Sequence, residues 1–253
     1  MILKMNNYSL EGLNITAADF LRPFFAPNET VCLRVFSDKP DSAFSGQKLE
    51  CEMAHFEEME HTLKAHNEQN RGVYFVINYG GHEDSQISRI NAQFMECDDI
   101  PLEEQLAKIQ AFPLEPSLIV KTRKSLHCYW LIKHGDVSAF RRVQRKLISY
   151  FGADTSCVNE SRVFRLPGFH HHKKEPVLVQ VIKYNPFAYL LGTIPAQASD
   201  RADQPIEDLC FDFPRPVIPA ARGFVHLDMV YQIHQQFPRQ IADVIVLFYQ
   251  FAE

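Results

Sequence analysis

One stretch of the sequence constrains the fold more than any other, because it combines strand-like alternation with two acids. Residues 92–100 read Ala-Gln-Phe-Met-Glu-Cys-Asp-Asp-Ile. Alternate side chains of a β-strand share a face, so Glu96 and Asp98 are predicted to project together from one side of a strand. Two neighbouring carboxylates repel each other, and a hard cation such as Mg²⁺, which prefers oxygen ligands, removes the conflict. The pattern therefore indicates a metal site, and the alternative is a strand that runs out into an acidic loop.

The composition places few other limits on the chain. It has 253 residues, of which 46 % are hydrophobic and 23 % charged, as in ordinary globular proteins. No apolar run is long enough to span a bilayer and the N-terminus has no secretory pattern, so we expect a cytoplasmic protein with no membrane partner. None of the six cysteines forms a Cys-x-x-Cys pair, which argues against a zinc ribbon or a thioredoxin-like site.

The charge is distributed unevenly along the chain. The net charge is −5, yet residues 121–174 contain twelve Lys and Arg against three Asp and Glu. A basic surface of this kind attracts phosphate-rich partners such as nucleotides and nucleic acids.

The periodicity of apolar residues predicts alternating helices and strands. An α+β fold follows, in which the acid strand and a hairpin share a mixed or antiparallel sheet with helices packed on it. We expect residues 154–168 to be irregular. The predicted strands are residues 31–36, 73–78, 90–98, 117–122, 126–132 and 176–184, and the predicted helices are residues 51–67, 101–112 and 136–151, with mixed helical character over 9–25.

Three later segments carry side chains suited to the same chemistry as the acid strand. His127 and Ser125, in the hairpin, can donate hydrogen bonds to phosphate oxygens. Asp154, just after a helix, offers a third carboxylate, as two-metal sites for phosphoryl displacement require. Arg162 and Arg165 have guanidinium groups that match phosphate oxygens. Each residue also has an ordinary interpretation: a structural histidine, a capping aspartate, or a surface ion pair.

In this order, the segments resemble the archaeo-eukaryotic primase superfamily, and most closely its plasmid and phage branch of RepB-like primases and primase-polymerases. The resemblance covers residues 31–183. It rests on the acid strand, on Lys-Ser-Leu-His-Cys-Tyr-Trp at 124–130 and on Ser-Arg-Val-Phe-Arg-Leu-Pro-Gly at 161–168. The sequence departs from the pattern at Glu96, where Asp is common, and at Leu126, where Gly is common.

The resemblance implies a function and a set of site residues. It implies a DNA-dependent primase or polymerase of a plasmid, phage or mobile element, with an RRM-like catalytic core. This enzyme would transfer nucleotides from NTP or dNTP on a single-stranded DNA template, with Mg²⁺ or Mn²⁺ as cofactor. The implied metal ligands are Glu96, Asp98 and Asp154, which with His127 form the catalytic set; the implied nucleotide contacts are Lys121, Ser125, His127, Arg162, Arg165 and Lys173.

Domain organisation and alternative functions complete the set of expectations. We expect a catalytic domain at 1–194 with an N-terminal α/β part, a linker at 195–222, and a helical appendage at 223–253 that ends inside a helical pattern. A replicative helicase is a further candidate partner. The main alternative is a non-catalytic replication-initiator module that binds DNA. A third is a metal-dependent nicking nuclease that uses the histidines at 170–172 and Tyr150 as nucleophile.

Overall fold

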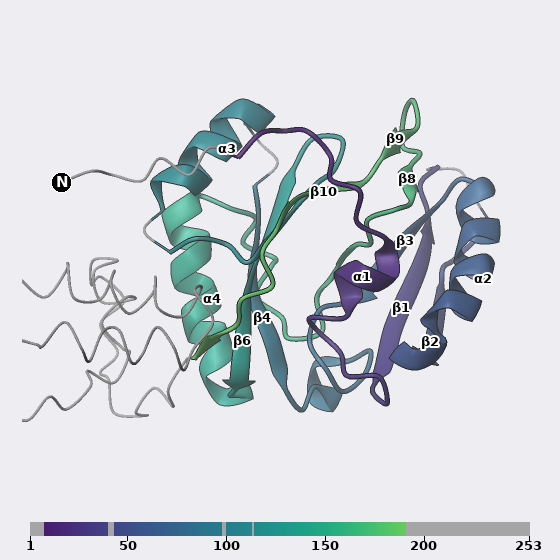
Figure 1. Ribbon diagram of the computed structural model, residues 1–253, viewed down its shortest axis with the longest axis horizontal. Helices are drawn as coiled ribbons and strands as arrows, with labels where there is room; N and C mark the ends of the chain where they lie inside the picture. The colour runs from purple at the N-terminus through teal and green to yellow at the C-terminus, as the bar shows by residue number, and fades with distance from the viewer. Residues whose placement is uncertain (1–7, 40–42, 98–99, 113, 191–253) are drawn as a thin grey trace, which may run out of the picture. The chain divides into compact units, whose positions relative to one another are not determined.

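Two β-sheets share an apolar core in the computed structural model, which describes residues 8–39, 43–97, 100–112 and 114–190. The first sheet has the order β2-β1-β3-β7, and the second has the order β10-β5-β6, with β4 on the other edge of β6. Figure 1 shows α2 beside the first sheet and α3 and α4 beside the second. The first sheet consists of β1 (Thr30–Ser37), β2 (Gln47–Glu52), β3 (Arg71–Val76) and β7 (Val163–Arg165), and α2 spans Phe56–Glu68.

The second sheet carries the acid strand and the hairpin. The acid strand β4 pairs antiparallel with β6, as do β5 with β6 and β10 with β5, whereas the short β11 pairs parallel with β6. The predicted α+β class with a mixed sheet is therefore confirmed. These strands are β4 (Ile90–Cys97), β5 (Leu118–Lys121), β6 (Leu126–Gly135), β10 (Gln180–Tyr184) and β11 (Tyr189–Leu190), and the helices beside them are α3 (Leu102–Ala111) and α4 (Val137–Phe151).

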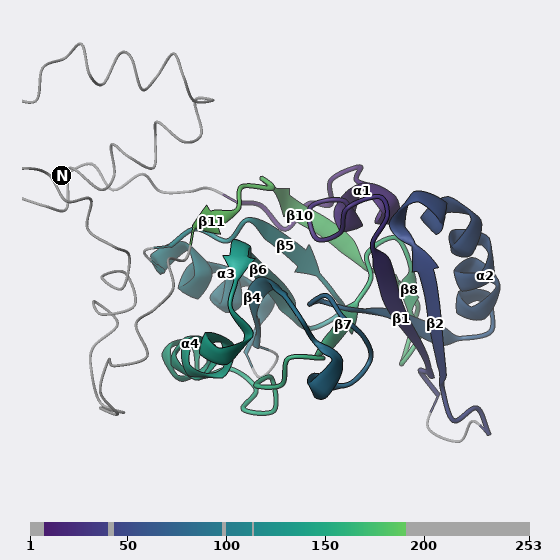
Figure 2. The ribbon, with the colours of Figure 1, turned by 90° about the horizontal axis from the view of Figure 1, so that it is seen from below.

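Aromatic side chains join the two sheets in the core. Phe20, at the end of the short helix α1 (Ala17–Leu21), makes edge-to-face contacts with Phe75 of β3 at 5.5 Å and with Tyr129 of β6 at 5.6 Å. Phe94 of β4 contacts Phe164 of β7 at 5.3 Å. Such pairs stabilise beyond the area that they bury, so the core fixes the two sheets against each other. Figure 2 shows α1 next to β1 and β10.

Helix α4 is the element that the sequence predicts best. Asp136 caps its first turn by accepting a hydrogen bond from the Ser138 N–H at 2.9 Å. Phe140, Leu147 and other residues at three- and four-residue steps are buried against the sheet. Gly152 ends the helix in the left-handed conformation, with φ of 62°, where glycine is favoured.

Three predictions made from local sequence patterns are wrong. The helix predicted over residues 51–67 begins only at Phe56, because the preceding residues pair with β1 as β2 and then form the 3-10 turn η1 (Met53–His55). Helical structure in residues 9–25 is limited to α1, since the Leu13 N–H donates to the carbonyl of Val181 in β10. The supposedly irregular residues 154–168 contain β7, which pairs with β3. In all three cases a partner distant in sequence decides the structure.

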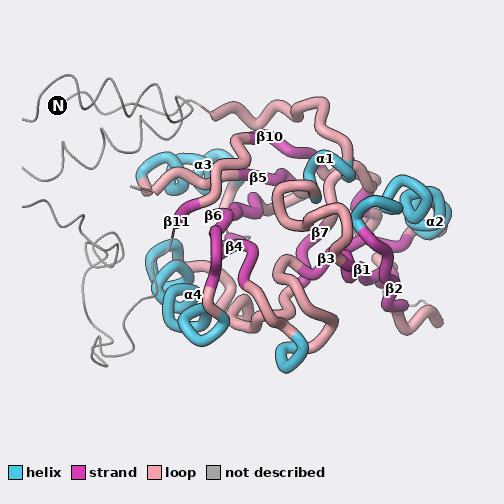
Figure 3. The backbone as a smooth tube through the Cα atoms, turned by 60° about the horizontal axis from the view of Figure 1, so that its bottom comes forward, coloured by secondary structure: helices cyan, strands magenta, loops and turns pink. Residues whose placement is uncertain are grey.

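The remaining described elements are a short hairpin and a second 3-10 turn. β8 (His170–His171) pairs with β9 (Val177–Leu178), and η2 spans Asp84–Gln86. Figure 3 distinguishes the larger helices and strands from the loops that connect them. No helix in the described ranges is both long and apolar enough to cross a bilayer. The predicted linker and helical appendage lie outside the described residues.

Candidate active site

The candidate site is built around one carboxylate oxygen. The β4–β6 register places Glu96 directly opposite His127. The Ser125 hydroxyl donates to Glu96 Oε1 at 2.9 Å, and His127 Nε2 lies 3.2 Å from the same oxygen. Thr122 Oγ1 lies 2.9 Å from the Ser125 hydroxyl and fixes the turn that carries it. The structure thus brings together three predicted site residues, from β4, from β6 and from the turn that precedes β6.

This arrangement keeps Glu96 ionised. Burial alone would raise the pKa of the Glu96 carboxyl, but the charge and hydrogen bond of His127, the Ser125 hydroxyl and the charge of Arg162 outweigh it and hold the pKa at about 2. The Glu96 side chain is 22 % exposed, whereas that of His127 is 3 % exposed. His127 Nδ1 is buried and has no hydrogen-bond partner among the described residues. A charged carboxylate therefore faces solvent with Ser125 and His127 behind it.

Asp154 lies next to the acid strand, although 58 residues separate it from Glu96 in sequence. Its backbone N–H donates to the Glu96 carbonyl at 3.3 Å. Its carboxylate accepts from the Ser156 N–H and hydroxyl at 2.8 and 2.6 Å, and these bonds lower the pKa of Asp154. The charge of Glu96 acts in the opposite direction on that pKa, as expected for neighbouring carboxylates. Asp98, the third predicted ligand, lies outside the described residues.

The two arginines of the Arg-Val-Phe-Arg segment lie in different environments. Arg162 Nη2 donates to Asp154 Oδ2 at 3.2 Å, so Arg162 belongs to the carboxylate site. Arg165 is nearly buried, donates to both Asp38 oxygens at 3.2 and 2.6 Å, and lies 4.7 Å above the Tyr74 ring. The two residues are three apart and the strand alternates, which explains why they do not share a face.

The two predicted lysines are not equivalent either. Lys121 is opposite Leu126 in the β5–β6 pair, one position from the Val120–His127 pair, so it lies on the other face of the sheet from His127. Its Nζ donates to the Leu10 carbonyl at 2.6 Å. The structure thus does not bring Lys121 to the site. Lys173 is exposed in the segment between β8 and β9, and its charge contributes to lowering the pKa of His171.

Three further residues lie in or beside the segments that form the site. Phe164 stacks on His127 with ring centroids 4.4 Å apart. Gln144 of α4 is fully buried and its Nε2 donates to the carbonyls of Phe94 and Cys157, at 2.6 and 2.9 Å. Arg123 has two buried guanidinium nitrogens, Nε and Nη2, with no hydrogen-bond partner in the part of the chain that the structure describes. Arg123 had a sequence signal, since it lies two residues before Ser125, but Gln144 had none.

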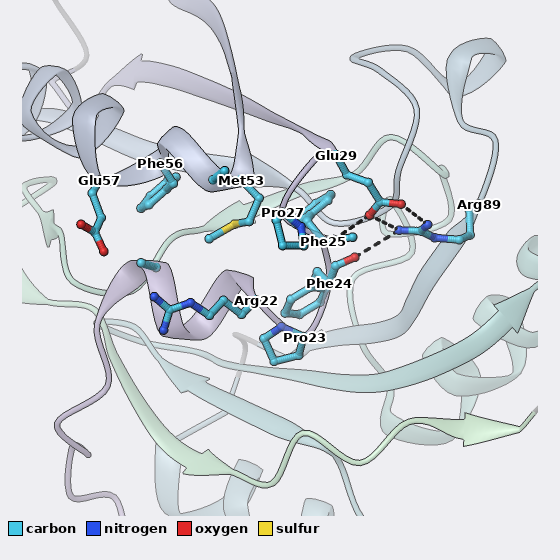
Figure 4. Close-up of a pocket in the computed structure, with 13 residues that line it drawn as sticks. Arg22, Pro23, Phe24, Phe25, Pro27, Glu29, Met53, Phe56, Glu57 and Arg89 are labelled. Carbon is cyan, nitrogen blue, oxygen red and sulfur yellow. Dashed lines mark hydrogen bonds and ion pairs between the residues drawn. The ribbon is translucent and has the colours of Figure 1, made fainter.

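A cavity lies elsewhere in the fold, beside α1 and η1. Its volume is about 540 Å³, and Phe24, Met53 and Phe56 contribute to its apolar lining. Arg89 borders it and pairs with Glu29, as Figure 4 shows. No predicted site residue lines this cavity, so it is separate from the candidate active site.

The nuclease alternative finds little support in the geometry. Tyr150 packs against Phe112 and Phe151, with ring centroids 4.9 Å away in both cases, and belongs to the aromatic cluster under α4. His171 and His172 have buried ring nitrogens without hydrogen-bond partners among the described residues. The segment is held next to Asp38, whose Oδ2 accepts a hydrogen bond from the His172 backbone N–H at 2.8 Å. No described contact joins Tyr150 to these histidines.

Solved structures with the same fold are known. The AEP domain of a cyanophage S-2L primase-polymerase (PrimPol) matches with a TM-score of 0.59 and 28 % identity, over 67 % of this chain and 89 % of that chain. A primase RepB′ matches with a TM-score of 0.53 and 18 % identity, over 68 % of this chain and 58 % of that chain. The catalytic domain of RepB′, solved with initiator DNA, matches with a TM-score of 0.53 and 20 % identity, over 68 % and 85 % of the two chains. The RepB′ matches show the fold alone.

The sequence itself identifies the family. No protein of curated function matches the chain. Residues 55–188, which are more than half of the chain, match the RepB DNA-primase N-terminal domain. This range contains β3 to β10, and with them every residue of the candidate site. The chain therefore belongs to the RepB DNA-primase N-terminal domain family.

Proposed function

We propose that the protein is a DNA-dependent primase or primase-polymerase of a plasmid, phage or mobile element. The reaction is the transfer of a nucleotide from NTP or dNTP to a 3′-hydroxyl, directed by a single-stranded DNA template. The single observation that carries the proposal is the joining of Glu96, Ser125 and His127 around one carboxylate oxygen, with Asp154 hydrogen-bonded to the same strand. Membership of a primase family and the fold shared with a primase-polymerase domain support it.

The carboxylates fit a Mg²⁺ or Mn²⁺ ion. Glu96 has a pKa of about 2 and is charged at neutral pH, and the pKa of Asp154 is also lowered, so both present anionic oxygens without a proton to displace. We propose that these two residues hold the metal together with Asp98. A metal bound there would activate the attacking hydroxyl and stabilise the pyrophosphate that leaves.

We propose two tasks for the residues behind and beside the carboxylates. Ser125 and His127 orient Glu96 through their contacts with its Oε1. Arg162 balances the negative charge of Asp154. Cations in a site of this kind stabilise the charge that develops on the phosphate groups in the transition state. Loss of the contacts that Ser125, His127 or Arg162 makes with the carboxylates should therefore slow nucleotide transfer more than it weakens nucleotide binding.

We propose that the phosphate groups of nucleotide or template meet a cluster of positive charge formed by Arg123, Arg165 and Lys173. Burial lowers the pKa of His171, and the charges of Arg165, Arg123 and Lys173 act in the same direction, whereas the charge of Asp38 opposes them. Arg123 is the strongest candidate because two of its donors lack partners in the described ranges. Arg165 retains N–H groups beyond the two that bind Asp38. We leave Lys121 out of the proposed nucleotide contacts, because it faces the opposite side of the sheet.

Nucleotide incorporation on a primed single-stranded template tests the proposal. With Mg²⁺ or Mn²⁺, Glu96→Gln, Asp98→Ala and Asp154→Asn should each lower the rate at least about 100-fold, since each removes a metal ligand. Glu58→Gln, an exposed change on α2, is the matched control and should keep the wild-type rate. Unchanged activity in Asp98→Ala would exclude the assignment.

One observation favours a second candidate, a non-catalytic replication-initiator module that binds DNA. His127 and Ser125 are only 3 % and 2 % exposed and already contact Glu96, as in a purely structural network. Such a module would bind DNA with strong salt dependence. Salt-sensitive DNA binding without any nucleotide incorporation, in either metal, would favour this function over the enzyme.

A further inference from the structure

A second cluster of side chains that can bind a metal lies on the first sheet. It is on β1 and β2, at the opposite edge of that sheet from β7. Cys32 of β1 and Glu50 of β2 are directly opposite each other in the antiparallel pair. His82 lies in the loop that follows β3. One donor atom from each residue lies within 4.8 Å of the other two. None of these residues takes part in the candidate active site, and the cluster has no role in the function proposed above.

The donor atoms have the chemistry and the spacing of a zinc site. Thiolate, imidazole and carboxylate are the ligand types that Zn²⁺ prefers, with bonds of about 2.0 to 2.3 Å in a tetrahedral arrangement. Bonds of that length place a nitrogen and an oxygen ligand about 3.3 Å apart. His82 Nε2 lies 3.2 Å from Glu50 Oε1. The Cys32 Sγ lies within 4.8 Å of a donor atom of each of the other two residues, so the thiol completes the set by moving closer to the ion.

The imidazole of His82 is buried and its ring nitrogens have unused bonding capacity in the described part of the chain. Its side chain is only 8 % exposed, and neither ring nitrogen makes a hydrogen bond within the described residues, in spite of the nearby Glu50 oxygen. Buried polar atoms nearly always have partners, so a histidine in this state requires an explanation. A neutral imidazole in this position can donate a ring lone pair to a metal ion.

The loop that carries His82 is held in place from three directions. The Arg34 guanidinium donates to the His82 carbonyl. The N–H groups of His82 and Glu83 both donate to Gln86 Oε1 at 2.9 Å. Lys48 pairs with Glu83 at 2.6 Å, which neutralises one of the two cations near the cluster. The ligand is therefore positioned before any metal arrives, which favours binding.

We propose that Cys32, Glu50 and His82 bind one Zn²⁺ ion, with water in the fourth position. Glu50 is 58 % exposed, so the fourth position opens to solvent on its side. Burial raises the pKa of the Cys32 thiol to about 11, so the metal displaces the thiol proton, which passes to the solvent as the Zn–S bond forms. The ion would fix the position of the loop that carries His82 and leads to η2. In η2, Asp84 Oδ1 accepts a hydrogen bond from the hydroxyl of Ser161, the residue before Arg162, at 2.7 Å.

Cobalt spectroscopy on the metal-free protein tests the proposal. Co²⁺ substitutes for Zn²⁺ and gives a near-ultraviolet thiolate charge-transfer band only when a cysteine binds it. In wild type we expect this band to reach its full intensity at one equivalent of Co²⁺ and to disappear when Zn²⁺ displaces the Co²⁺. Cys157 Sγ lies 3.8 Å from Asp154 Oδ2 in the candidate active site, so a Cys32→Ser variant, which keeps Cys157, distinguishes a band of this site from one of the active site and of the proposed function.

Variants distinguish the proposed ligands from their neighbours. Cys32→Ser should abolish the band, whereas Cys51→Ser should keep it, because Cys51 is next to Glu50 on β2 but packs towards the core. Glu50→Gln, a change at an exposed position that does not threaten folding, should keep the band and weaken Co²⁺ binding at least about tenfold. Zn²⁺ should raise the thermal midpoint of wild type and Cys51→Ser but not that of Cys32→Ser. Absence of the band in wild type, or its persistence in Cys32→Ser, would overturn the proposal.

Discussion

Gln144 joins the two distant segments that form the candidate site, and its replacement by leucine should destabilise the fold markedly. Its Nε2 donates to the Phe94 carbonyl at 2.6 Å and to the Cys157 carbonyl at 2.9 Å, and its Oε1 accepts weakly from the Phe94 N–H at 3.4 Å. Phe94 is two residues before Glu96, and Cys157 is three residues after Asp154. Leucine has a similar size but can make none of these bonds.

The cost follows from the polar groups that would be left without partners. Gln144 is fully buried, so water cannot replace it without rearrangement. Each buried carbonyl that loses its partner costs about 1 to 3 kcal/mol, and the weak third bond adds less. We therefore expect Gln144→Leu to lower the free energy of unfolding by about 3 to 5 kcal/mol, a large part of the 5 to 15 kcal/mol typical of a domain.

Urea denaturation at neutral pH, followed by circular dichroism, measures this loss. Arg145→Leu introduces the same side chain one position along α4, at an exposed site, and should change the free energy of unfolding by less than about 0.5 kcal/mol. Under conditions where Gln144→Leu remains folded, it should also incorporate nucleotides more slowly, because the Asp154 turn is no longer fixed to β4. A loss below 1 kcal/mol, or equal to that of Arg145→Leu, would refute the reasoning.

Three further predictions concern charge and backbone conformation. The folded-state pKa of Glu96 is about 2 against an ordinary value of 4.5, so its ionisation contributes about 3 kcal/mol to stability above pH 4.5, and this contribution is lost as the pH falls towards 2. Denaturation across this range should show that the difference in unfolding free energy between wild type and Glu96→Gln shrinks as the pH falls, and a constant difference would contradict the assignment. Asp38→Ala leaves the buried Arg165 charge unpaired and should cost about 3 to 5 kcal/mol, and less when Arg165→Met is added; equal losses in the single and double variants would argue against the pair. Gly152→Ala should cost about 1 kcal/mol, because its Cβ meets no atom within 4 Å but its φ of 62° disfavours alanine; a neutral substitution would mean that the helix end relaxes.

Local patterns in the sequence predict most of the second sheet. The acid strand, the hairpin and α4 have clear alternation, turn residues and caps, and the structure places them within three residues of the predicted bounds. Ser125 approaches Glu96 because β4 pairs with β6, the second strand of the hairpin. Three strands that follow one another in the order β4, β5 and β6 have few possible arrangements in one sheet, so this pairing was among the few to consider. For these elements, local and tertiary preferences agree.

Other parts of the fold depend on partners that no local pattern reveals. The strands β2 and β7 form because β1 and β3 offer them free edges, and their own sequences are short or helix-like. Alternation alone could have separated Arg162 from Arg165, because the two residues are an odd number of positions apart in an extended segment. Gln144 has no sequence signal, since a glutamine on an amphipathic helix is usually exposed.

The most direct measurement of the central claim is synthesis of labelled product on an unprimed single strand by wild type, Glu96→Gln and Asp154→Asn, with Mg²⁺ or Mn²⁺ and with the folded state of each variant verified. If carboxylates from two distant segments form one site with Ser125 and His127, wild type should make product and both variants should lose it at least about 100-fold. Full synthesis by either variant, at wild-type stability, would contradict the account.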